Sequence, residues 1–193
     1  MTLPIVAYGD PVLRKPGEWV EEDSPEIQEL IDAMFETMYS AGGVGLAAPQ
    51  VGRSLRLFVI DTTPFAEGEE DEEAAQLNDF KRVFIDPEIE EETGDFWSFN
   101  EGCLSIPEVR EDVNRRSAIT VHYLDRNFEE QSETLDGLRA RVVQHEYDHI
   151  EGILFTDHLK PLRRRMLKGR LQNIAKGKVD VKYKMKFPLL KKA

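Results

Sequence analysis

Apolar residues recur at helical spacing between residues 24 and 43. The recurring positions are Ile27, Leu30, Ile31, Met34, Phe35, Met38 and Tyr39. Ser24 suits an N-cap and Pro25 suits the first helical position, while Gly42-Gly43 ends the pattern. We therefore predict an amphipathic helix that packs this apolar stripe against the core.

Runs with strand character follow this helix. Residues 55–61 and 82–85 are rich in aliphatic and aromatic side chains, and residues 118–124 alternate apolar with polar positions. Residues 128–135 suit an antiparallel partner for the last of these, across a turn at 125–127. The sequence therefore predicts several short antiparallel strands.

Two more helices are predicted near the C-terminus. One starts near Asp136-Gly137 and ends before Gly152, and a strongly basic one follows Pro161. In residues 179–187, apolar residues alternate with polar residues that are mostly lysine. This alternation predicts a strand with one solvent-exposed face. The pattern indicates an α+β fold with antiparallel strands packed around the central helix, and the length favours one domain over residues 1–193.

Charge is unevenly distributed along the chain, whose net charge is −12. Glu67 to Glu73 is an acidic low-complexity stretch, which predicts a mobile surface insertion near residues 64–80. The C-terminal segment 160–193 instead holds 13 basic residues and one acid, Asp180. Such a segment is either a solvated cationic face or a contact for nucleic acid or another acidic surface.

The composition also excludes some classes of protein. No apolar run approaches the roughly 20 residues that a membrane span needs, and the N-terminus lacks the basic and apolar regions of a signal peptide. We expect a cytoplasmic protein with no membrane or DNA partner. The single cysteine, Cys103, is either a small buried apolar residue or a ligand or nucleophile.

The strongest chemical motif is His145-Glu146-Tyr147-Asp148-His149 on the predicted central helix. Residues i and i+4 share one helix face, so both imidazoles can bind one metal ion with the glutamate beside them. The alternative is an exposed polar helix with two chance histidines. Because the chain has only 4 histidines, this spacing around a glutamate favours metal binding.

A catalytic metal site usually needs a third protein ligand. Downstream candidates are Glu151, Asp157 and His158, while Cys103 lies upstream within the segment Glu-Gly-Cys-Leu-Ser at residues 101–105. A thiolate is a strong ligand for Zn(II) and Fe(II). The residues alone leave this choice open.

A third motif, residues 43–50, reads Gly-Val-Gly-Leu-Ala-Ala-Pro-Gln. It is either a plain glycine-rich loop at a helix end or a place where a substrate backbone approaches the chain closely. Gln50 carries an amide that can donate to a developing oxyanion.

These three motifs together resemble the peptide deformylases, which carry Gly-x-Gly-x-Ala-Ala-x-Gln, Glu-Gly-Cys-Leu-Ser and Gln-His-Glu-x-Asp-His in this order. Here they lie at residues 43–50, 101–105 and 144–149, and the resemblance runs from Tyr8 to about Leu162. It implies a metal-dependent hydrolase that removes the formyl group from the N-terminal formyl-methionine of newly synthesised proteins and releases formate.

The resemblance also implies the roles of site residues. One metal ion per chain, Fe(II) replaceable by Zn(II) or Ni(II), would be bound by Cys103, His145 and His149. Glu146 would transfer protons, and the Gln50 amide and the Leu104 backbone N–H would hold the oxyanion. For the substrate, Val44, Gly45 and Gly102 would pair with the peptide backbone, Val44, Val142 and Tyr147 would form the methionine pocket, and Arg110 would anchor the substrate region.

The resemblance implies nascent formylated peptides as partners, with ribosome contact through the basic C-terminal segment. Two other functions remain open on the residues. A zinc peptidase using the same helix would not depend on Cys103. A metal-stabilised binding protein would need a closed site with a fourth ligand, for which the motifs offer no clear residue.

Overall fold

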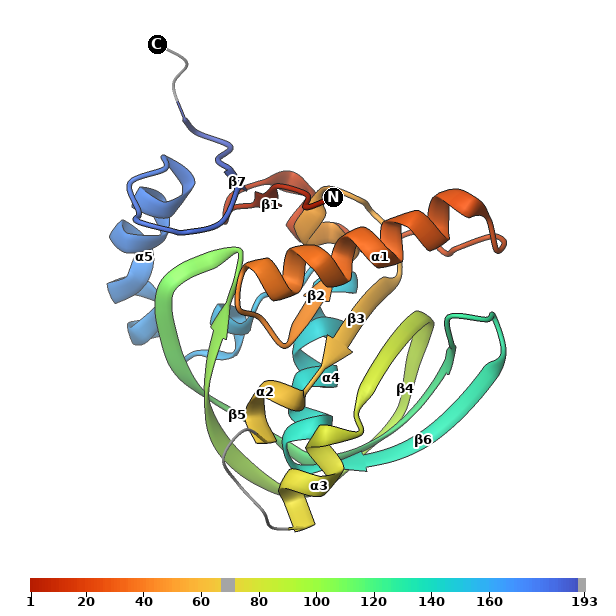
Figure 1. The fold of residues 1–193 in the computed structure, drawn as a ribbon. Helices are drawn as coiled ribbons and strands as arrows, with labels where there is room; N and C mark the ends of the chain where they lie inside the picture. The colour runs from red at the N-terminus through yellow and green to blue at the C-terminus, as the bar shows by residue number, and fades with distance from the viewer. Residues whose placement is uncertain (67–71, 191–193) are drawn as a thin grey trace.

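A five-stranded antiparallel sheet with strand order β2-β3-β4-β5-β6 forms the frame of the molecule (Figure 1). The structure, a computed structural model, describes residues 1–66 and 72–190. Its strands are β2 (Gly45–Ala47), β3 (Leu57–Asp61), β4 (Lys81–Cys103), β5 (Ile106–Leu124) and β6 (Glu130–Asp136). The expected α+β class is confirmed.

Strands β4 and β5 form one long hairpin of which the sequence pattern indicates only the base. Residues 82–85 and 118–124 were predicted as strands, but β4 continues to Cys103 and β5 begins at Ile106. The pairing shifts register between Ile85 and Glu88, between Ile89 and Glu91 and again between Thr93 and Phe96. Beyond Phe96 the pairing is regular up to Gly102. Buried positions there include the charged Glu101 and Arg115, so no apolar alternation marks this part of the hairpin as strand.

Helix α4 (Gly137–Ile150) lies against the sheet and contacts β2, β3, β5 and β6. Its buried residues Ala140, Val143 and Ile150 join a core cluster with Phe58 and Phe84 of the sheet. This packing places the His-Glu-x-x-His motif between the short strand β2 and the long hairpin.

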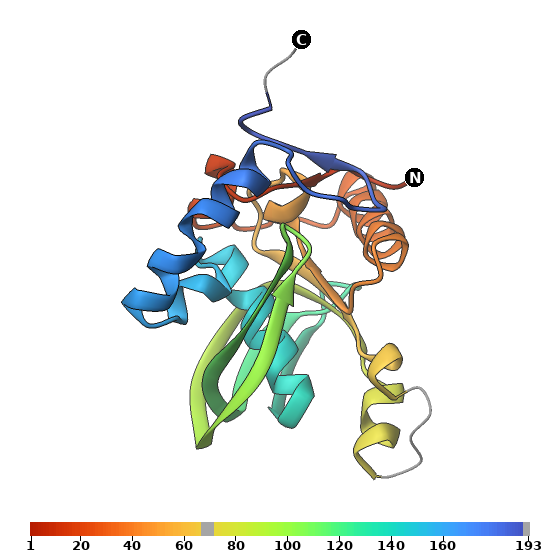
Figure 2. The same ribbon diagram turned by 90° about the vertical axis from the view of Figure 1, so that its left-hand side faces the viewer.

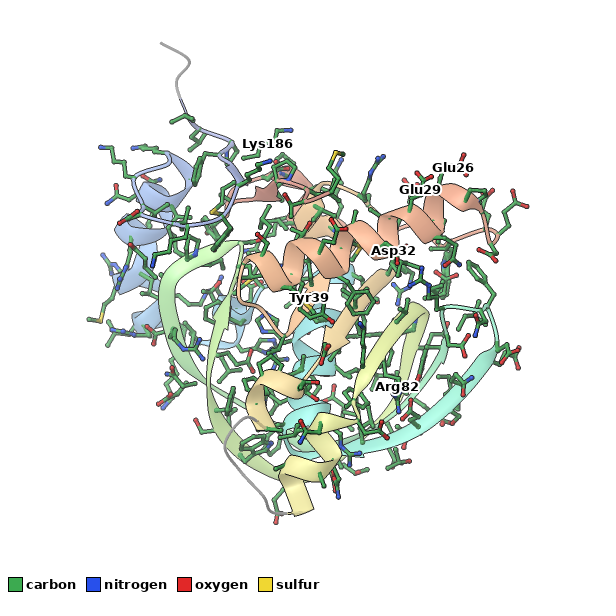
Figure 3. All side chains as sticks on the ribbon, viewed as in Figure 1. Glu26, Glu29, Asp32, Tyr39, Arg82 and Lys186 are labelled. Atoms are coloured by element: carbon green, nitrogen blue, oxygen red, sulfur yellow. The ribbon has the colours of Figure 1, made fainter. Side chains whose placement is uncertain are left out.

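Helix α1 (Pro25–Ser40) covers a second core cluster, and it begins as predicted at an N-cap where the Ser24 hydroxyl accepts a hydrogen bond from the Ile27 N–H. Its exposed residues Glu26, Glu29 and Asp32 lie on the outer side of the helix (Figure 3).

Within residues 1–66 and 72–190, three 3₁₀ segments and two short helices complete the connections between these elements. The 3₁₀ segments are η1 (Pro11–Arg14), η2 (Ala48–Val51) and η3 (Phe155–His158). Helices α2 (Thr63–Ala66) and α3 (Glu72–Asn78) flank the acidic stretch, whose residues 67–71 lie outside the described part of the chain. The flanks of the expected insertion are packed rather than free, because Ala66, Ala74 and Leu77 form a small buried cluster.

The C-terminal part differs most from its prediction. Helix α5 (Pro161–Ala175) follows Pro161 as expected, but the strand predicted over 179–187 is reduced to β7 (Met185–Lys186), which pairs in parallel with β1 (Ile5–Val6). Figure 2 shows this pairing beside the tip of the β4–β5 hairpin. The alternation of apolar residues had a different cause, because Val179, Met185 and Phe187 pack against the core beneath α5.

In the described part of the chain, no helix is both long enough and apolar enough to cross a membrane. The assignment of all 193 residues to one domain stays a prediction.

Candidate metal centre and active site

Three possible metal ligands meet where helix α4 passes the tip of the β4–β5 hairpin. His145 and His149 lie one turn apart on α4, and Cys103 is the last residue of β4. One ligand atom from each residue lies within 4.8 Å of the others, and the Cys103 Sγ lies 3.3 Å from the His149 Nε2. One thiolate and two imidazoles form a donor set that suits Zn(II) or Fe(II) and leaves a coordination position for water or substrate.

The carboxylate of Glu101 orients the first of these histidines. The His145 Nδ1 donates a hydrogen bond of 2.9 Å to the Glu101 Oε2, which leaves the Nε2 lone pair for a metal ion. Successive residues of a strand face opposite sides, so Glu101 and Cys103 share one face of β4. The motifs alone gave Glu101 no predicted role, although its place two residues before the cysteine was a usable signal.

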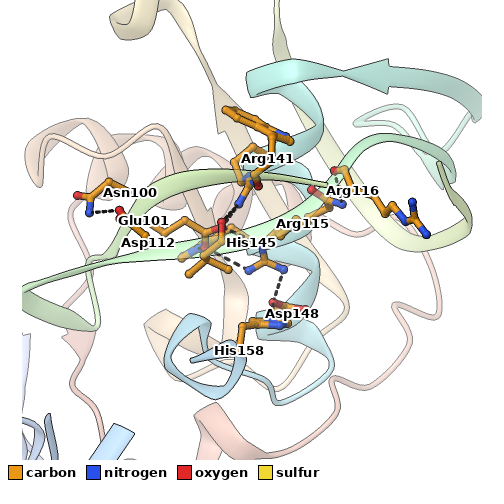
Figure 4. A network of polar contacts seen from close by, with 12 residues as sticks. Asn100, Glu101, Asp112, Arg115, Arg116, Arg141, His145, Asp148 and His158 are labelled. Atoms are coloured by element: carbon orange, nitrogen blue, oxygen red, sulfur yellow. Dashed lines mark hydrogen bonds and ion pairs between the residues drawn. The ribbon is translucent and has the colours of Figure 1, made fainter. Parts of the chain in front are cut away.

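Glu101 is the centre of a buried network of charges (Figure 4). It accepts hydrogen bonds from Arg115 at 2.7 Å and from Arg141 at 3.0 Å. Arg115 also donates to Asp148 at 2.8 Å, and Asp148 is 2.7 Å from the His158 Nε2. The network thus ties the hairpin to helix α4.

Burial and charge act against each other on the pKa values of the site. Burial alone favours neutral Glu101, but hydrogen bonds from His145 and Arg115 outweigh it and hold the pKa of this carboxyl well below its usual range. Burial likewise raises the pKa of the Cys103 thiol, yet attraction to His149 and hydrogen bonds from both histidines lower it to about 5. The cluster therefore favours the thiolate, the form that binds a metal.

The carboxylate of Glu146 has a buried oxygen without a hydrogen-bond partner among the described residues. This oxygen is the Oε2, and the side chain is buried. Burial raises the pKa of Glu146 to about 7, against the attraction of His145 and His149. An unpartnered buried oxygen beside the three ligands is what a metal site with a nearby water would require, so these residues fit a bound divalent ion.

Gln50, which lies in η2, extends its side chain toward the cluster of Cys103, His145 and His149. Its Oε1 accepts a hydrogen bond of 2.8 Å from the Ala47 N–H. Its Nε2 therefore faces the site, 3.4 Å from the Cys103 Sγ and 3.3 Å from the Ser105 Oγ. The amide is thus oriented to donate, as an oxyanion would require.

A cavity of about 480 Å³ opens onto this cluster. Sequence-predicted residues that line it are Val44, Gly45, Gln50, Gly102, Cys103, Leu104, Arg110, Val142, His145 and Glu146. Lining residues that sequence reasoning missed are mostly apolar and include Phe65, Phe99, Ile106, Val109, Val181 and Tyr183. Several come from segments distant in the sequence, and no motif marked them.

The structure does not bring every candidate into the cavity. Tyr147 is not among the described lining residues, and its ring faces Arg56, whose guanidinium carbon lies 5.8 Å from the ring centroid. The physical reason is helix geometry, because a residue two positions after His145 points to the opposite side of α4. His149 is buried behind the cavity wall and reaches the cluster through its Nε2.

The three downstream candidates for the third metal ligand, Glu151, Asp157 and His158, form contacts away from the His145–His149 pair. Glu151 forms an ion pair with Arg56 at 2.6 Å, and Asp157 forms one with Arg14 at 2.5 Å. His158 is held by Asp148, so the described residues bring together Cys103 rather than His158 with the histidine pair.

At two positions of the site, a neighbouring side chain lies so close to the backbone that only glycine fits without displacing it. A Cβ added to Gly45 would lie 2.4 Å from the Glu146 Oε1, so any side chain here would displace the carboxylate. A Cβ on Gly102 would lie 2.7 Å from the Arg110 Nη1. Arg110 itself donates to the Asn100 Oδ1 at 3.0 Å, which holds its side chain across Gly102 at the cavity wall.

A family model described as polypeptide deformylase matches residues 2–165 of the chain. The chain belongs to the polypeptide deformylase family. The resemblance found in the three motifs is thereby confirmed.

Two relatives and two solved structures show the extent of the similarity. The peptide deformylase of Christiangramia forsetii is 60% identical over 195 residues, covering 100% of this chain and 100% of that protein. That of Flavobacterium johnsoniae is 55% identical, covering 100% of this chain and 99% of that protein. Among solved structures, the Ehrlichia chaffeensis peptide deformylase has a TM-score of 0.82 at 32% identity, covering 92% of this chain and 99% of that one. The Legionella pneumophila enzyme has a TM-score of 0.77 at 39% identity, covering 92% and 98%.

Proposed function

We propose that this chain hydrolyses the formyl amide of N-terminal formyl-methionine on newly synthesised proteins, releasing formate and a free amine. The observation that carries this proposal is the Cys103–His145–His149 cluster with the unpartnered Glu146 carboxylate beside it, at a largely apolar cavity. The membership of the chain in the deformylase family supports the same reaction.

Cys103, His145 and His149 would hold one metal ion, and the donor set fits Fe(II), with Zn(II) or Ni(II) as replacements. A divalent ion at this point supplies Lewis acidity, which activates water near neutral pH and polarises the formyl carbonyl. The thiolate and the oriented His145 are the contributions of the protein to this chemistry.

Glu146 moves the proton in this proposal. The carboxylate takes a proton from the attacking water as the C–O bond forms, and it delivers this proton to the amide nitrogen as the C–N bond breaks. Burial favours the protonated form of this carboxyl, so a proton taken from water can be held until it passes to the leaving nitrogen.

Other residues of the cavity would hold the substrate. The Gln50 Nε2 and the Leu104 N–H would donate to the oxyanion that develops on the formyl oxygen. Backbone groups of Val44, Gly45 and Gly102 would pair with the peptide as an added strand, with Arg110 beside them. Val44 and Val142 would contact the methionine side chain, because both line the cavity.

The direct test is formate release from formyl-Met-Ala-Ser by anaerobically purified protein, with metal analysis of the same sample. We expect one formate per peptide cleaved and one metal ion per chain. Cys103→Ser should lose both the metal and the activity. A peptidase would instead cleave internal peptide bonds and tolerate this change, and a purely structural metal site would give no formate with the ion bound.

We further propose a cytoplasmic location and contact with ribosomal RNA through α5, because nascent chains are the substrate and residues such as Arg165 and Lys168 are exposed on this helix. An Arg165→Gln/Lys168→Gln variant should co-sediment less with ribosomes at low salt, with a salt dependence shallower by roughly one to two ion equivalents. Lys15→Gln/Arg53→Gln removes the same charge from exposed positions outside α5 and is the matched control. Equal co-sedimentation of both variants would contradict the contact.

A further inference from the structure

The C-terminal tail, residues 176–190, returns to the active-site cavity after α5. Asp180, Val181 and Tyr183 line the cavity together with the residues of the three motifs. The tail lies beyond residues 2–165, which are the part of the chain that the family model matches. It therefore supplies part of the cavity wall from outside the motif-bearing region.

The tail is held against the body of the protein by backbone and apolar contacts. The Ile5 N–H donates to the Lys184 carbonyl and the Ala7 N–H donates to the Lys186 carbonyl, each at 2.9 Å. The half-buried Tyr183 packs against the core cluster beneath α1, and Met185 packs against two core clusters. These contacts fix the tail in register with β1 beside the hairpin.

The tip of the β4–β5 hairpin is the part of the site that the tail contacts. Cys103 pairs with Ile106, so Leu104 and Ser105 form a two-residue loop. The Ser105 carbonyl accepts a hydrogen bond of 2.8 Å from the Tyr8 N–H. The Leu104 carbonyl accepts one of 2.8 Å from the Tyr183 hydroxyl. Both carbonyls of the loop are therefore fixed by segments outside the hairpin.

We propose that Tyr183 is a positioning residue for deformylation, which acts by restraining Leu104 in the loop that follows the metal ligand Cys103. This inference rests on the proposed function, in which the Leu104 N–H donates to the oxyanion. The hydrogen bond from Tyr183 fixes the peptide plane between Leu104 and Ser105. The Leu104 N–H lies in the preceding peptide plane, next to Cys103, which is paired with Ile106. With both neighbouring segments held, the Leu104 backbone has less freedom to turn its N–H away from the site. A donor that is fixed before the reaction stabilises developing charge better than one that must be reoriented.

The test compares Tyr183→Phe with a matched control, Tyr123→Phe. Tyr183→Phe removes one hydroxyl and keeps the ring that packs against the core. Tyr123→Phe removes a hydroxyl that contacts Glu133, and Tyr123 is not among the described residues that line the cavity. Truncation of the tail is unsuitable, because it also removes the β1–β7 pairing and the apolar contacts of the tail.

With formyl-Met-Ala-Ser as substrate, we expect Tyr183→Phe to lower kcat about fivefold, as the loss of one hydrogen bond predicts. KM should stay within about twofold and the metal content should not change, because the interaction acts mainly in the transition state. Tyr123→Phe should keep the wild-type kcat. A wild-type kcat in Tyr183→Phe, or an equal loss in both variants, would overturn the proposal.

Amide hydrogen exchange gives a second readout that does not depend on the reaction. The restraint predicts faster exchange at Leu104 and Ser105 in Tyr183→Phe but not in Tyr123→Phe, with other amides of β4 and β5 unchanged. If the wild-type protein released no formate, the proposed function would fail while the exchange experiment still decided whether Tyr183 restrains the loop. Unchanged exchange at both residues would refute that restraint.

Discussion

Replacing Glu146 by glutamine should lower kcat for formyl-peptide hydrolysis by about 10²–10⁴-fold, the usual contribution of a positioned general base and acid. Glutamine has nearly the shape of glutamate, but its amide cannot take a proton from water and return it to the leaving nitrogen. Glu146 is buried beside Gly45, and the other described carboxylate of the cluster, Glu101, is bound to His145, Arg115 and Arg141. Formate release under saturating substrate measures the effect.

Metal content distinguishes this result from damage to the site. Cys103, His145 and His149 remain in the Glu146→Gln variant, so one metal ion per chain should be retained. Glu90→Gln, which alters an exposed carboxylate paired with His122, is the matched control and should keep wild-type kcat. A Glu146→Gln variant that holds its metal and keeps kcat within about fivefold of wild type would rule out the proton transfer proposed for this residue.

Replacing Glu101 by glutamine should produce the largest loss of stability, about 3–5 kcal/mol in the free energy of unfolding. Glu101 is the carboxylate partner of the fully buried Arg141 and one of two partners of Arg115. Glutamine preserves the shape of the side chain but leaves buried positive charge without compensation. Urea unfolding followed by circular dichroism measures the change.

The same substitution should weaken metal binding, because the His145 Nδ1 loses its carboxylate acceptor. Loss of a hydrogen bond of this kind typically lowers metal affinity about 10–100-fold. Glu90→Gln again serves as control, since an exposed pair contributes little to stability. An unfolding midpoint equal to that of Glu90→Gln would show that the network does not depend on the charge of Glu101.

Local features of the molecule were predictable because their causes lie within a few residues. Ser24 caps α1 as its position indicated, and Pro161 begins α5. The placement of His145 and His149 on one face of α4 follows from helical geometry alone. The same geometry argues against Tyr147 as a pocket residue, and the structure places its ring toward Arg56.

Features that depend on packing between distant segments were not predictable in this way. The outer part of the β4–β5 hairpin has no regular apolar alternation, because charged residues such as Glu101 and Arg115 occupy buried positions in it. The apolar positions of the tail were interpreted as a strand, whereas most of them pack against the core and only Met185–Lys186 pairs as a strand.

The sequence by itself determined the deformylase motifs, the helical histidine pair with Glu146, and the α+β class, because these depend on residue type and short spacing. The motif resemblance pointed to Cys103 as the neighbour of that pair, but only the tertiary structure showed it there and His158 elsewhere, since this depends on where the hairpin tip meets α4. It also revealed Glu101 as the group that orients His145 and Tyr183 as a contact of Leu104. These contacts join residues 44 and 79 positions apart, and side-chain contacts over such separations arise only when the chain folds.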